Sequence, residues 1–273
     1  AEAIAALRGD GVEVGLSPHA PYTVGPDLWA ALIQRDELAG VSWSTHLAES
    51  PAELRWHHRG DGPLGEAYAP LGVVPARWGA TSAGVIGALE HHGALRDGLI
   101  AAHCVRLEDG EAEVLAERSV VAVHCPSSNR RLLCGRMPLA RLRGAGVTVA
   151  LGTDSPASGG PFDLRVEARA AADLHAASGE APDAEALVRM MTTGGASAIG
   201  RSGDLGALAP GYRADAVVLS RVPGLNGWQA AIDERAEVRM TLIGGAPAWD
   251  RENPPADTGP IETSAQGIRE GLC

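Results

Sequence analysis

The sequence predicts an α/β fold built on a parallel β-sheet, and three observations lead to this prediction. An apolar, β-branched run followed by a polar loop and then a helix-like stretch recurs five times along the chain. The runs are almost continuously apolar, as is typical of parallel strands that are covered on both faces. Each run also ends in a histidine or an aspartate. This β-then-α order indicates either a doubly wound sheet or a barrel.

The five units follow one another along most of the chain. The strand-like runs span residues 12–19, 41–50, 98–107, 119–129 and 147–158, and the helix-like stretches that follow them span 26–38, 51–58, 108–117, 137–146 and 162–177. In the first unit, prolines on both sides of His19 exclude a regular helix or central strand and predict a rigid loop. Residues 182–200 are expected to form one further helix that ends at Gly200.

Composition narrows the class of protein. The chain has 273 residues, of which 45% are hydrophobic and 21% charged, enough for a large core. The formal net charge is −11 and no long basic cluster offsets it, so nucleic acid is not an expected partner. No apolar run approaches the ~20 residues of a membrane span, so no membrane partner is expected. The four cysteines form no CxxC pair and are interpreted as reduced thiols of a cytoplasmic protein.

The pattern of strand-like and helix-like stretches predicts three regions. Residues 1–203 carry the β/α rhythm, residues 204–250 have short strands and turns without alternating helices, and residues 251–273 form a Pro-, Gly- and acid-rich tail. Within the first region, residues 59–97 interrupt the rhythm and are interpreted as an active-site insertion and a candidate lid.

Histidine, glutamate and aspartate side chains stand at the ends of the strand-like runs. Because ligands of parallel α/β folds bind at the carboxyl ends of the strands, these side chains are expected to meet at one edge. For any single histidine a structural role is the better interpretation, but five equivalent positions favour a site. The residues at these ends are His19, His46 with Glu49, His103, His124 and Asp154, and the histidines 57, 58, 91, 92 and 175 are expected at the surface.

The motifs at these ends resemble those of a known superfamily. "SPHAPYTV", "THLAES", "AHCVRL", "VHCPSSN" and "LGTDSPAS", in this order, are similar to the metal-dependent amidohydrolases. The likeness is to their aminohydrolase branch, which includes guanine, adenosylhomocysteine and aminofutalosine deaminases and chlorotriazine hydrolases. "LGALAPGYRADAVVL" resembles the segment by which that family's chain returns from a barrel to a β-sandwich. The likeness covers roughly residues 10–245.

The resemblance implies a (β/α)₈ barrel of which this chain holds strands 4–8, a β-sandwich part, and one divalent metal, Zn²⁺ or alternatively Fe²⁺. It also implies a homodimer for the full-length protein. In this resemblance His46 is a metal ligand, and Asp154 is a ligand or a neighbour of the metal-bound water. Glu49 is the proton shuttle, His103 polarises the substrate or the attacking water, and His19 contacts the substrate. Ser128 and Asn129, in the loop after the seventh barrel strand, help to shape the pocket. A role for His124 is less defined.

The physical logic of such a site is consistent with hydrolysis. A borderline divalent ion lowers the pKa of a bound water from 15.7 to roughly 7, and the resulting hydroxide attacks an amidine carbon. Glu49, when protonated, donates to the ring nitrogen, and Asp154 takes the water's proton and passes it to the departing ammonia. The substrate class implied is an aminated purine-type heterocycle, with 6-amino-6-deoxyfutalosine as the specific expectation. The alternatives are a chlorohydrolase or cyclic-amide hydrolase on the same scaffold.

Two departures from the family pattern bear on this interpretation. The family's first barrel strand carries a His-x-His pair of metal ligands, and no such pair occurs here. The expectation is that three β/α units lie upstream of Ala1. A short homologue that has lost metal binding and catalysis, or a second chain that supplies the missing strands, are the alternatives. The second departure is Gly159, where many relatives carry an asparagine, which weakens the analogy with the adenosylhomocysteine and triazine groups.

Overall fold

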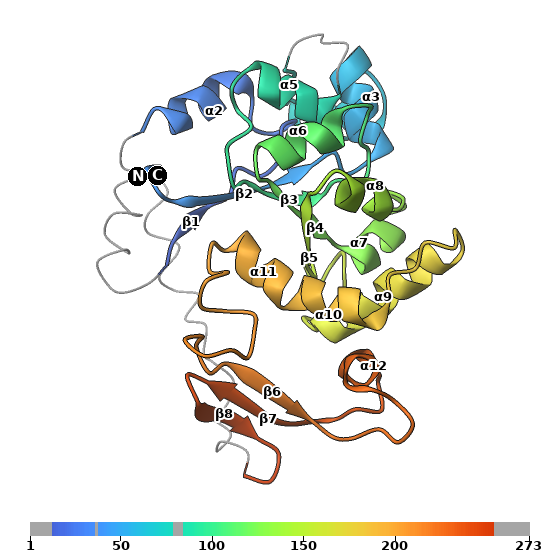
Figure 1. Cartoon of the computed structure of the whole chain (residues 1–273). Coiled ribbons are helices and arrows are strands. Elements are labelled where there is room, and N and C mark those ends of the chain that lie inside the picture. Colours follow the sequence, from blue (N-terminus) through green and yellow to red (C-terminus); the bar gives the residue numbers. More distant parts are fainter. Residues whose placement is uncertain (1–12, 36–37, 79–83, 254–273) are drawn as a thin grey trace, which may run out of the picture.

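A parallel sheet of five strands forms the centre of the part of the chain that the structure, a computed structural model, describes: residues 13–35, 38–78 and 84–253. The strands pair side by side in chain order (Figure 1). This order lacks the reversal of a doubly wound sheet and is that of successive barrel strands, which confirms the α/β prediction. The strands are β1 (Gly15–Leu16), β2 (Ser42–Leu47), β3 (Ile100–His103), β4 (Val121–His124) and β5 (Thr148–Leu151).

Helices connect the strands and cover the sheet. Several begin where the sequence supplies a cap: Ser50, Asp163 and Asp183 each accept a hydrogen bond from a backbone N–H of the first turn that follows. The helices are α2 (Pro26–Ile33), α3 (Pro51–Arg59), α4 (Pro63–Tyr68), the 3₁₀ turn η2 (Ala69–Leu71), α5 (Val85–His91), α6 (Glu111–Glu117), α7 (Pro126–Arg131), α8 (Leu139–Gly144), α9 (Leu164–Ala176), α10 (Ala184–Met191) and α11 (Thr193–Ala198).

Two expectations about these helices are wrong. Residues 182–200 form two helices, because Thr192 leaves the helical region at φ −112° and ψ −84° and the chain turns between α10 and α11. The turn brings α11 directly onto the main chain of β5. The segment after β4 was expected to be a loop, but it is the short helix α7, whose first residue is Pro126.

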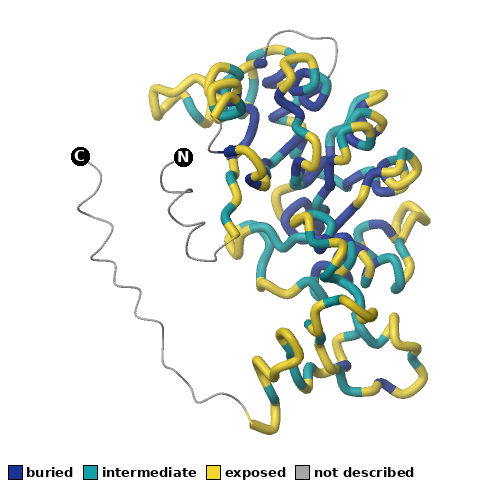
Figure 2. The backbone as a smooth tube through the Cα atoms, turned by 60° about the vertical axis from the view of Figure 1, so that its left-hand side comes forward, coloured by how far each residue is buried: buried dark blue, intermediate teal, exposed yellow. Residues whose placement is uncertain are grey.

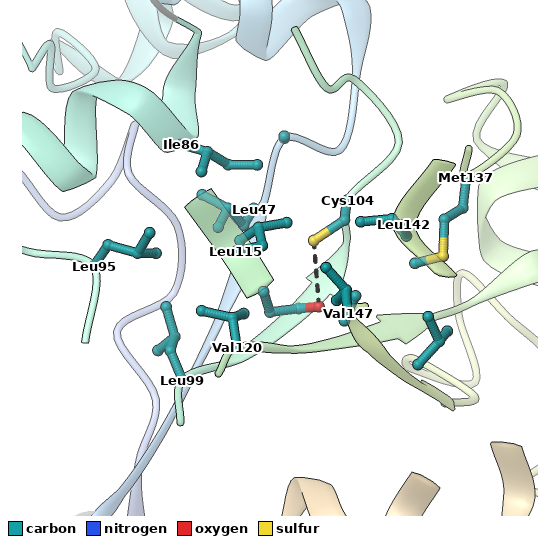
Figure 3. Close-up of a cluster of buried hydrophobic side chains, with 14 of the residues drawn as sticks. Leu47, Ile86, Leu95, Leu99, Cys104, Leu115, Val120, Met137, Leu142 and Val147 are labelled. Carbon is teal, nitrogen blue, oxygen red and sulfur yellow. Dashed lines mark hydrogen bonds between the residues drawn. The ribbon is translucent and has the colours of Figure 1, made fainter. Parts of the chain in front are cut away.

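The hydrophobic core lies between the sheet and the helices that follow its strands. Leucines from strands and helices meet there, among them Leu47, Leu99, Leu115 and Leu142, all at most 1% exposed (Figure 3). The thiol of Cys104 lies in the same cluster and donates to a strand carbonyl at 3.6 Å. The cysteines at 104, 125 and 134 are buried and free, whereas Cys273 lies outside the described residues.

A second, antiparallel sheet follows residue 203 (Figure 1). It consists of β6 (Ala216–Leu219), β7 (Val238–Ile243) and β8 (Ala246–Asp250). The expectation that this region has no helix between its strands is wrong, because α12 (Gly227–Ile232) separates β6 from β7. Figure 2 shows that this sheet is largely exposed, unlike the body above it.

Two arginines join the second sheet's region to the first. Arg165 and Arg169 of α9 donate to four main-chain carbonyls within residues 231–236, at 2.5–2.8 Å. Hydrogen bonds from a guanidinium to several carbonyls fix the position of α12 against α9. The boundaries at 203/204 and 250/251 remain predictions. Across the described residues, no helix has the length and apolar character needed to cross a membrane.

We predict that Gly194→Ala destabilises the fold. A Cβ atom at Gly194 would lie 2.5 Å from the carbonyl oxygen of Val149, so α11 would have to move off β5. The expected loss is about 1–3 kcal/mol of unfolding free energy, measured by chemical denaturation. Gly195→Ala is the matched control, because a Cβ there meets nothing within 4 Å and helix propensity favours alanine. Equal stability of the two variants would contradict the prediction.

Candidate active site

The main chain turns sharply at the carboxyl ends of three strands. Ala48, His103, Cys104 and Asp154 all have positive φ, between 45° and 74°, although none is glycine. Such left-handed conformations cost non-glycine residues of order 1 kcal/mol or more and persist only where the surroundings enforce them. Four such residues lie at one edge of the sheet, so the backbone there is strained and is kept in place by the surrounding structure.

Three side chains from these ends meet. One ligand-type atom each from His46, His103 and Asp154 lies within 4.8 Å of the others. These residues end β2 and β3 and follow β5, so segments 108 residues apart in the chain supply one cluster. The rings of His46 and His103 are stacked, with centroids 5.4 Å apart and planes 21° apart.

The orientation of His46 is fixed by a single acceptor. The carbonyl oxygen of His19 accepts the backbone N–H of His46 at 2.9 Å and its ring Nδ1–H at 2.7 Å. A carbonyl oxygen can only accept, so Nδ1 carries the proton in the neutral tautomer and Nε2 is then the nitrogen with a free lone pair. Nε2 is therefore free to act as a metal ligand or an acceptor.

His103 is held from the opposite side. Its Nδ1 donates to Oδ1 of Asn129 at 2.9 Å, and both side chains are buried. Its Nε2 lies 3.7 Å from Oε1 of Glu49. The helix α7 carries Asn129, so the helix that the sequence did not predict determines which nitrogen of His103 points toward Glu49.

Asp154 is held by two hydroxyl groups. Its Oδ2 accepts from Oγ of Ser128 and from Oγ of Ser158, both at 2.6 Å. Burial acts to raise the pKa of Asp154, but these two hydrogen bonds, with help from the Ser155 main chain and His103, outweigh it and lower the pKa. The carboxylate is therefore ionised at neutral pH and has a second oxygen available.

The loop that holds Asp154 explains the departure at Gly159. A Cβ atom at this position would lie 2.0 Å from the carbonyl oxygen of Thr153, the residue before Asp154. Any side chain here would force the turn open and displace Ser158 from the carboxylate. The loop therefore needs a glycine at position 159, because its backbone passes too close to Thr153 for a side chain.

The donor set fits a divalent cation. Two unprotonated imidazole nitrogens and one carboxylate oxygen are the ligand types that borderline divalent ions such as Zn²⁺ prefer. Catalytic zinc sites use three protein ligands and keep a further position open. Each of the three side chains is also held by a hydrogen bond from the protein itself: His46 to the His19 carbonyl, His103 to Asn129, and Asp154 to Ser128. Metal sites depend on such bonds to orient their ligands.

His19 lies beside this cluster, and its ring centroid is 5.0 Å from that of His46. Its Nδ1 is hydrogen-bonded to the hydroxyl of Thr23 at 2.9 Å. Burial and the neighbouring His46 lower the pKa of His19, while Glu49 acts to raise it. His19 is therefore a neutral imidazole, and only one of its two ring nitrogens is bonded to Thr23.

Glu53 is a residue of the site region that sequence reasoning missed. Its carboxylate accepts the backbone N–H groups of Ala48 and Glu49 at 3.3 and 2.6 Å and so holds the strained turn that carries Glu49. The side chain is only 3% exposed. The spacing Ser50-x-x-Glu53 before a helix, a capping-box pattern, was the signal that could have indicated it.

Glu167 likewise holds a backbone segment in place, at the start of α7. Located on α9 and fully buried, it accepts the backbone N–H of Ser127 at 3.0 Å. It thereby braces the start of α7, whose next two residues, Ser128 and Asn129, hold Asp154 and His103. Burial raises the pKa of Glu167. No sequence signal distinguishes it from an ordinary helical glutamate.

His124 does not join the cluster, contrary to the expectation from its place at a strand end. It is fully buried against α9, where its Nε2 lies 3.2 Å from Nε2 of His175. The guanidinium of Arg136 can only donate to Nδ1 of His175, so His175 donates through Nε2 to His124. Burial lowers the pKa of His124 to about 3, and the pair is neutral.

The expected surface position is also wrong for two other histidines. His175 is fully buried beside His124, and His57 on α3 is 5% exposed. Both lie on the inner face of their helices, which a histidine's polar character does not reveal.

The comparisons with known proteins agree with this architecture. The profile of the amidohydrolase family matches residues 1–247. The chain therefore belongs to the amidohydrolase family, and the resemblance to its aminohydrolase branch is confirmed.

Several relatives and solved structures carry deaminase names. The chain is 35% identical over 206 residues to a 5-methylthioadenosine/S-adenosylhomocysteine deaminase of Pelotomaculum thermopropionicum, covering 74% of this chain and 42% of the relative. It is 36% identical over 230 residues to a 5′-deoxyadenosine deaminase of Methanothermobacter thermautotrophicus, covering 82% and 48%. The chain thus spans about half the length of the curated relatives it matches.

Two zinc-containing structures are similar in fold. A structure of an adenosine deaminase from Xanthomonas campestris with bound zinc matches with a TM-score of 0.76 and 28% identity, covering 93% of this chain and 57% of that one. An atrazine chlorohydrolase from Arthrobacter aurescens in complex with zinc matches with a TM-score of 0.66 and 26% identity, covering 85% and 49%.

We predict that Glu53 makes stability depend on pH. Burial raises its pKa from about 4.5 to about 7, so the folded protein binds this proton more tightly than the unfolded chain. Its contribution is fully present below pH about 4.5 and is lost as the pH rises to about 7, by at most about 3 kcal/mol. Glu53→Gln, which cannot ionise, is expected to remove this slope in unfolding free energies measured between pH 4.5 and 7.5.

The exposed Glu113 on α6 provides the control for this comparison. Glu113→Gln should keep the pH slope of the unmodified protein. If Glu53→Gln keeps it as well, the carboxylate is not the group responsible.

Proposed function

We propose that the protein is a metal-dependent aminohydrolase that replaces the exocyclic amino group of a 6-aminopurine nucleoside with oxygen and releases ammonia. The observation that carries the proposal is the meeting of His46, His103 and Asp154 within 4.8 Å, with Oε1 of Glu49 3.7 Å from His103. Metal-ligand types and a proton-transferring carboxylate thus lie at one edge of the sheet, where ligands of such folds bind.

The substrate class is supported by what the relatives share. Methylthioadenosine, adenosylhomocysteine and 5′-deoxyadenosine, which name the relatives' activities, are all nucleosides with an amino group at the same purine carbon. They differ at the 5′ position of the sugar. A site that acts on the amidine carbon and tolerates different 5′ groups accounts for all of them.

The metal that we propose is zinc, held by His46 and Asp154, with His103 beside it in the same cluster. Zinc is present in the similar adenosine deaminase and chlorohydrolase structures. When bound, the ion supplies the Lewis acidity that makes water nucleophilic near neutral pH. Fe²⁺ accepts the same ligand types, and elemental analysis of the purified protein distinguishes the two.

The chain's own side chains would handle the protons. Glu49 would move a proton at Oε1 to the ring nitrogen of the substrate as the amidine carbon becomes tetrahedral. His103, oriented by Asn129, would accept a hydrogen bond from the attacking water through Nε2. Asp154, kept ionised by Ser128 and Ser158, would accept the water's proton and return it to the leaving amine. His19 would contact the substrate beside His46.

For the particular substrate we propose 6-amino-6-deoxyfutalosine, a purine nucleoside with the same amidine carbon. The support is the similarity of "SPHAPYTVGPDLW" and "LGTDSPASGGPFDLRVEAR" to aminofutalosine deaminases, and Gly159 belongs to the second of these segments. Ammonia release from this compound, 5′-deoxyadenosine and methylthioadenosine would rank the three, and chloride release from a chlorotriazine would favour the alternative hydrolase instead.

We predict that Glu49→Gln, in the protein expressed from its complete reading frame, lowers kcat by a factor of ~10²–10⁴, because a positioned proton transfer is worth that much. Metal content should remain that of the unmodified protein. His46→Ala should instead lose the metal, as measured by elemental analysis. Glu113→Gln, on the exposed side of α6, is the control for the loss of one carboxylate. Near-normal turnover by Glu49→Gln would refute the assignment of the proton shuttle.

A further inference from the structure

A row of aromatic rings begins beside the cluster of His46, His103 and Asp154. The ring of His19 lies 5.0 Å from that of His46, Tyr22 lies 5.9 Å from His19, and Tyr68 lies 6.5 Å from Tyr22, as centroid distances. His46 lies at the end of β2 and His19 and Tyr22 lie in the loop after β1, whereas Tyr68 ends α4 in the insertion of residues 59–97. The insertion therefore contributes one ring to a continuous aromatic strip.

Hydrogen bonds fix the insertion against the loop that carries His19 and Tyr22. The backbone N–H of Ala76 donates to the carbonyl of Tyr22 at 2.7 Å, and the indole N–H of Trp78 donates to the carbonyl of Pro21 at 2.9 Å. The indole of Trp56 on α3 donates in turn to the carbonyl of Ala76 at 3.1 Å. The segment from 75 to 78 is thus tied both to the site loop and to α3.

The position of α4 is fixed by the same tryptophan. Gly65 lies so close to the ring of Trp56 that a Cβ atom would approach it to 2.5 Å. Only a residue without a side chain allows this contact, so α4 rests directly on the indole ring. Tyr68 lies three residues further along the same helix, and this packing sets its position in the strip.

Exposed apolar side chains follow Tyr68 in the insertion. Leu71 and Val74 are 72% and 80% exposed. Exposed apolar side chains of this kind are often part of interaction surfaces.

We propose that Tyr22 and Tyr68 form a subsite for the 5′ substituent of the nucleoside, and that this subsite prefers a flat aromatic or apolar group. The inference rests on the proposed function: with the amino carbon at the His46–Asp154 cluster, the 5′ end is the part of a nucleoside that lies farthest outward. Tyrosine rings bind such groups by offset or edge-to-face contact. The subsite discriminates at the 5′ position, where the relatives' named substrates differ.

The test compares two substrates on the protein expressed from its complete reading frame. 5′-Deoxyadenosine lacks a 5′ substituent, and 5′-S-phenyl-5′-thioadenosine carries an aromatic one. Tyr68→Ala is expected to lower the ratio of their kcat/KM values, phenylthio over deoxy, by about three- to tenfold, the range of one aromatic contact. The loss should appear in KM of the phenylthio compound, with kcat and metal content unchanged, and Tyr68→Phe should retain the ratio.

Two further variants separate contact from folding. Gly65→Ala, which pushes α4 off Trp56, should lower the same ratio without removing the ring. Tyr212→Ala removes a tyrosine whose hydroxyl binds the Ser202 carbonyl, ahead of the second sheet, and should leave the ratio unchanged. An unchanged ratio in Tyr68→Ala, or an equal fall in Tyr212→Ala, overturns the subsite while the proposed function stands. If the unmodified protein releases ammonia from neither nucleoside, the proposed function fails, and the subsite fails with it.

Discussion

The carbonyl oxygen of His19 is the acceptor on which the geometry of the site depends. It receives a backbone N–H and a ring N–H from the same residue, His46. The first bond continues the β1–β2 ladder beyond Leu16, and the second fixes the tautomer of a candidate metal ligand. Strand register and ligand orientation are therefore not independent: a shift of β1 by one residue would remove the acceptor that keeps the proton off Nε2. The prolines around His19 hold this loop rigid, so the acceptor is in place before any ligand arrives.

Buried carboxylates hold the loops at this edge of the sheet. Glu53, Glu111 and Glu167 lie on three different helices. Glu53 accepts backbone N–H groups of the turn after β2, Glu111 those of Glu108 and of Gly87 in α5, and Glu167 that of Ser127 in α7. Burial raises the pKa of all three, so each costs stability in its charged form. Hydrogen bonds to main-chain donors offset that cost and oppose the strain of Ala48 and its neighbours. The rigidity of the candidate site is thus supplied by helices that provide none of its ligands.

How much of this the sequence could predict follows from the periodicity of strands. The β/α order and the position of each polar residue at a strand end are visible in the chain, because apolar runs stop there. The face of the sheet to which an end residue points is not visible, since side chains alternate and a short strand gives few positions to set the phase. His46 and His103 point to the cluster, whereas His124, in an equivalent place, points to α9. Glu167 and His175 escaped prediction for a related reason: a polar residue on the inner face of a helix interrupts the apolar pattern that would reveal it.

The cluster also constrains the shape of the sheet. Neighbouring strands lie about 4.8 Å apart, so β2 and β5, with two strands between them, would be separated by roughly 14 Å if the sheet were flat. His46 and Asp154 nevertheless bring ligand atoms within 4.8 Å of each other. Long side chains shorten part of that gap, but His46 is also tied to β1 on its other side, so its ring cannot simply lean toward β5. A sheet that curls toward the side on which these residues project closes the rest of this gap, and this is the curvature of a barrel wall. Curvature and the loop after β5 together bring these residues close enough to share one ion, whereas a flatter, doubly wound sheet would leave the whole gap to the loop and the side chains.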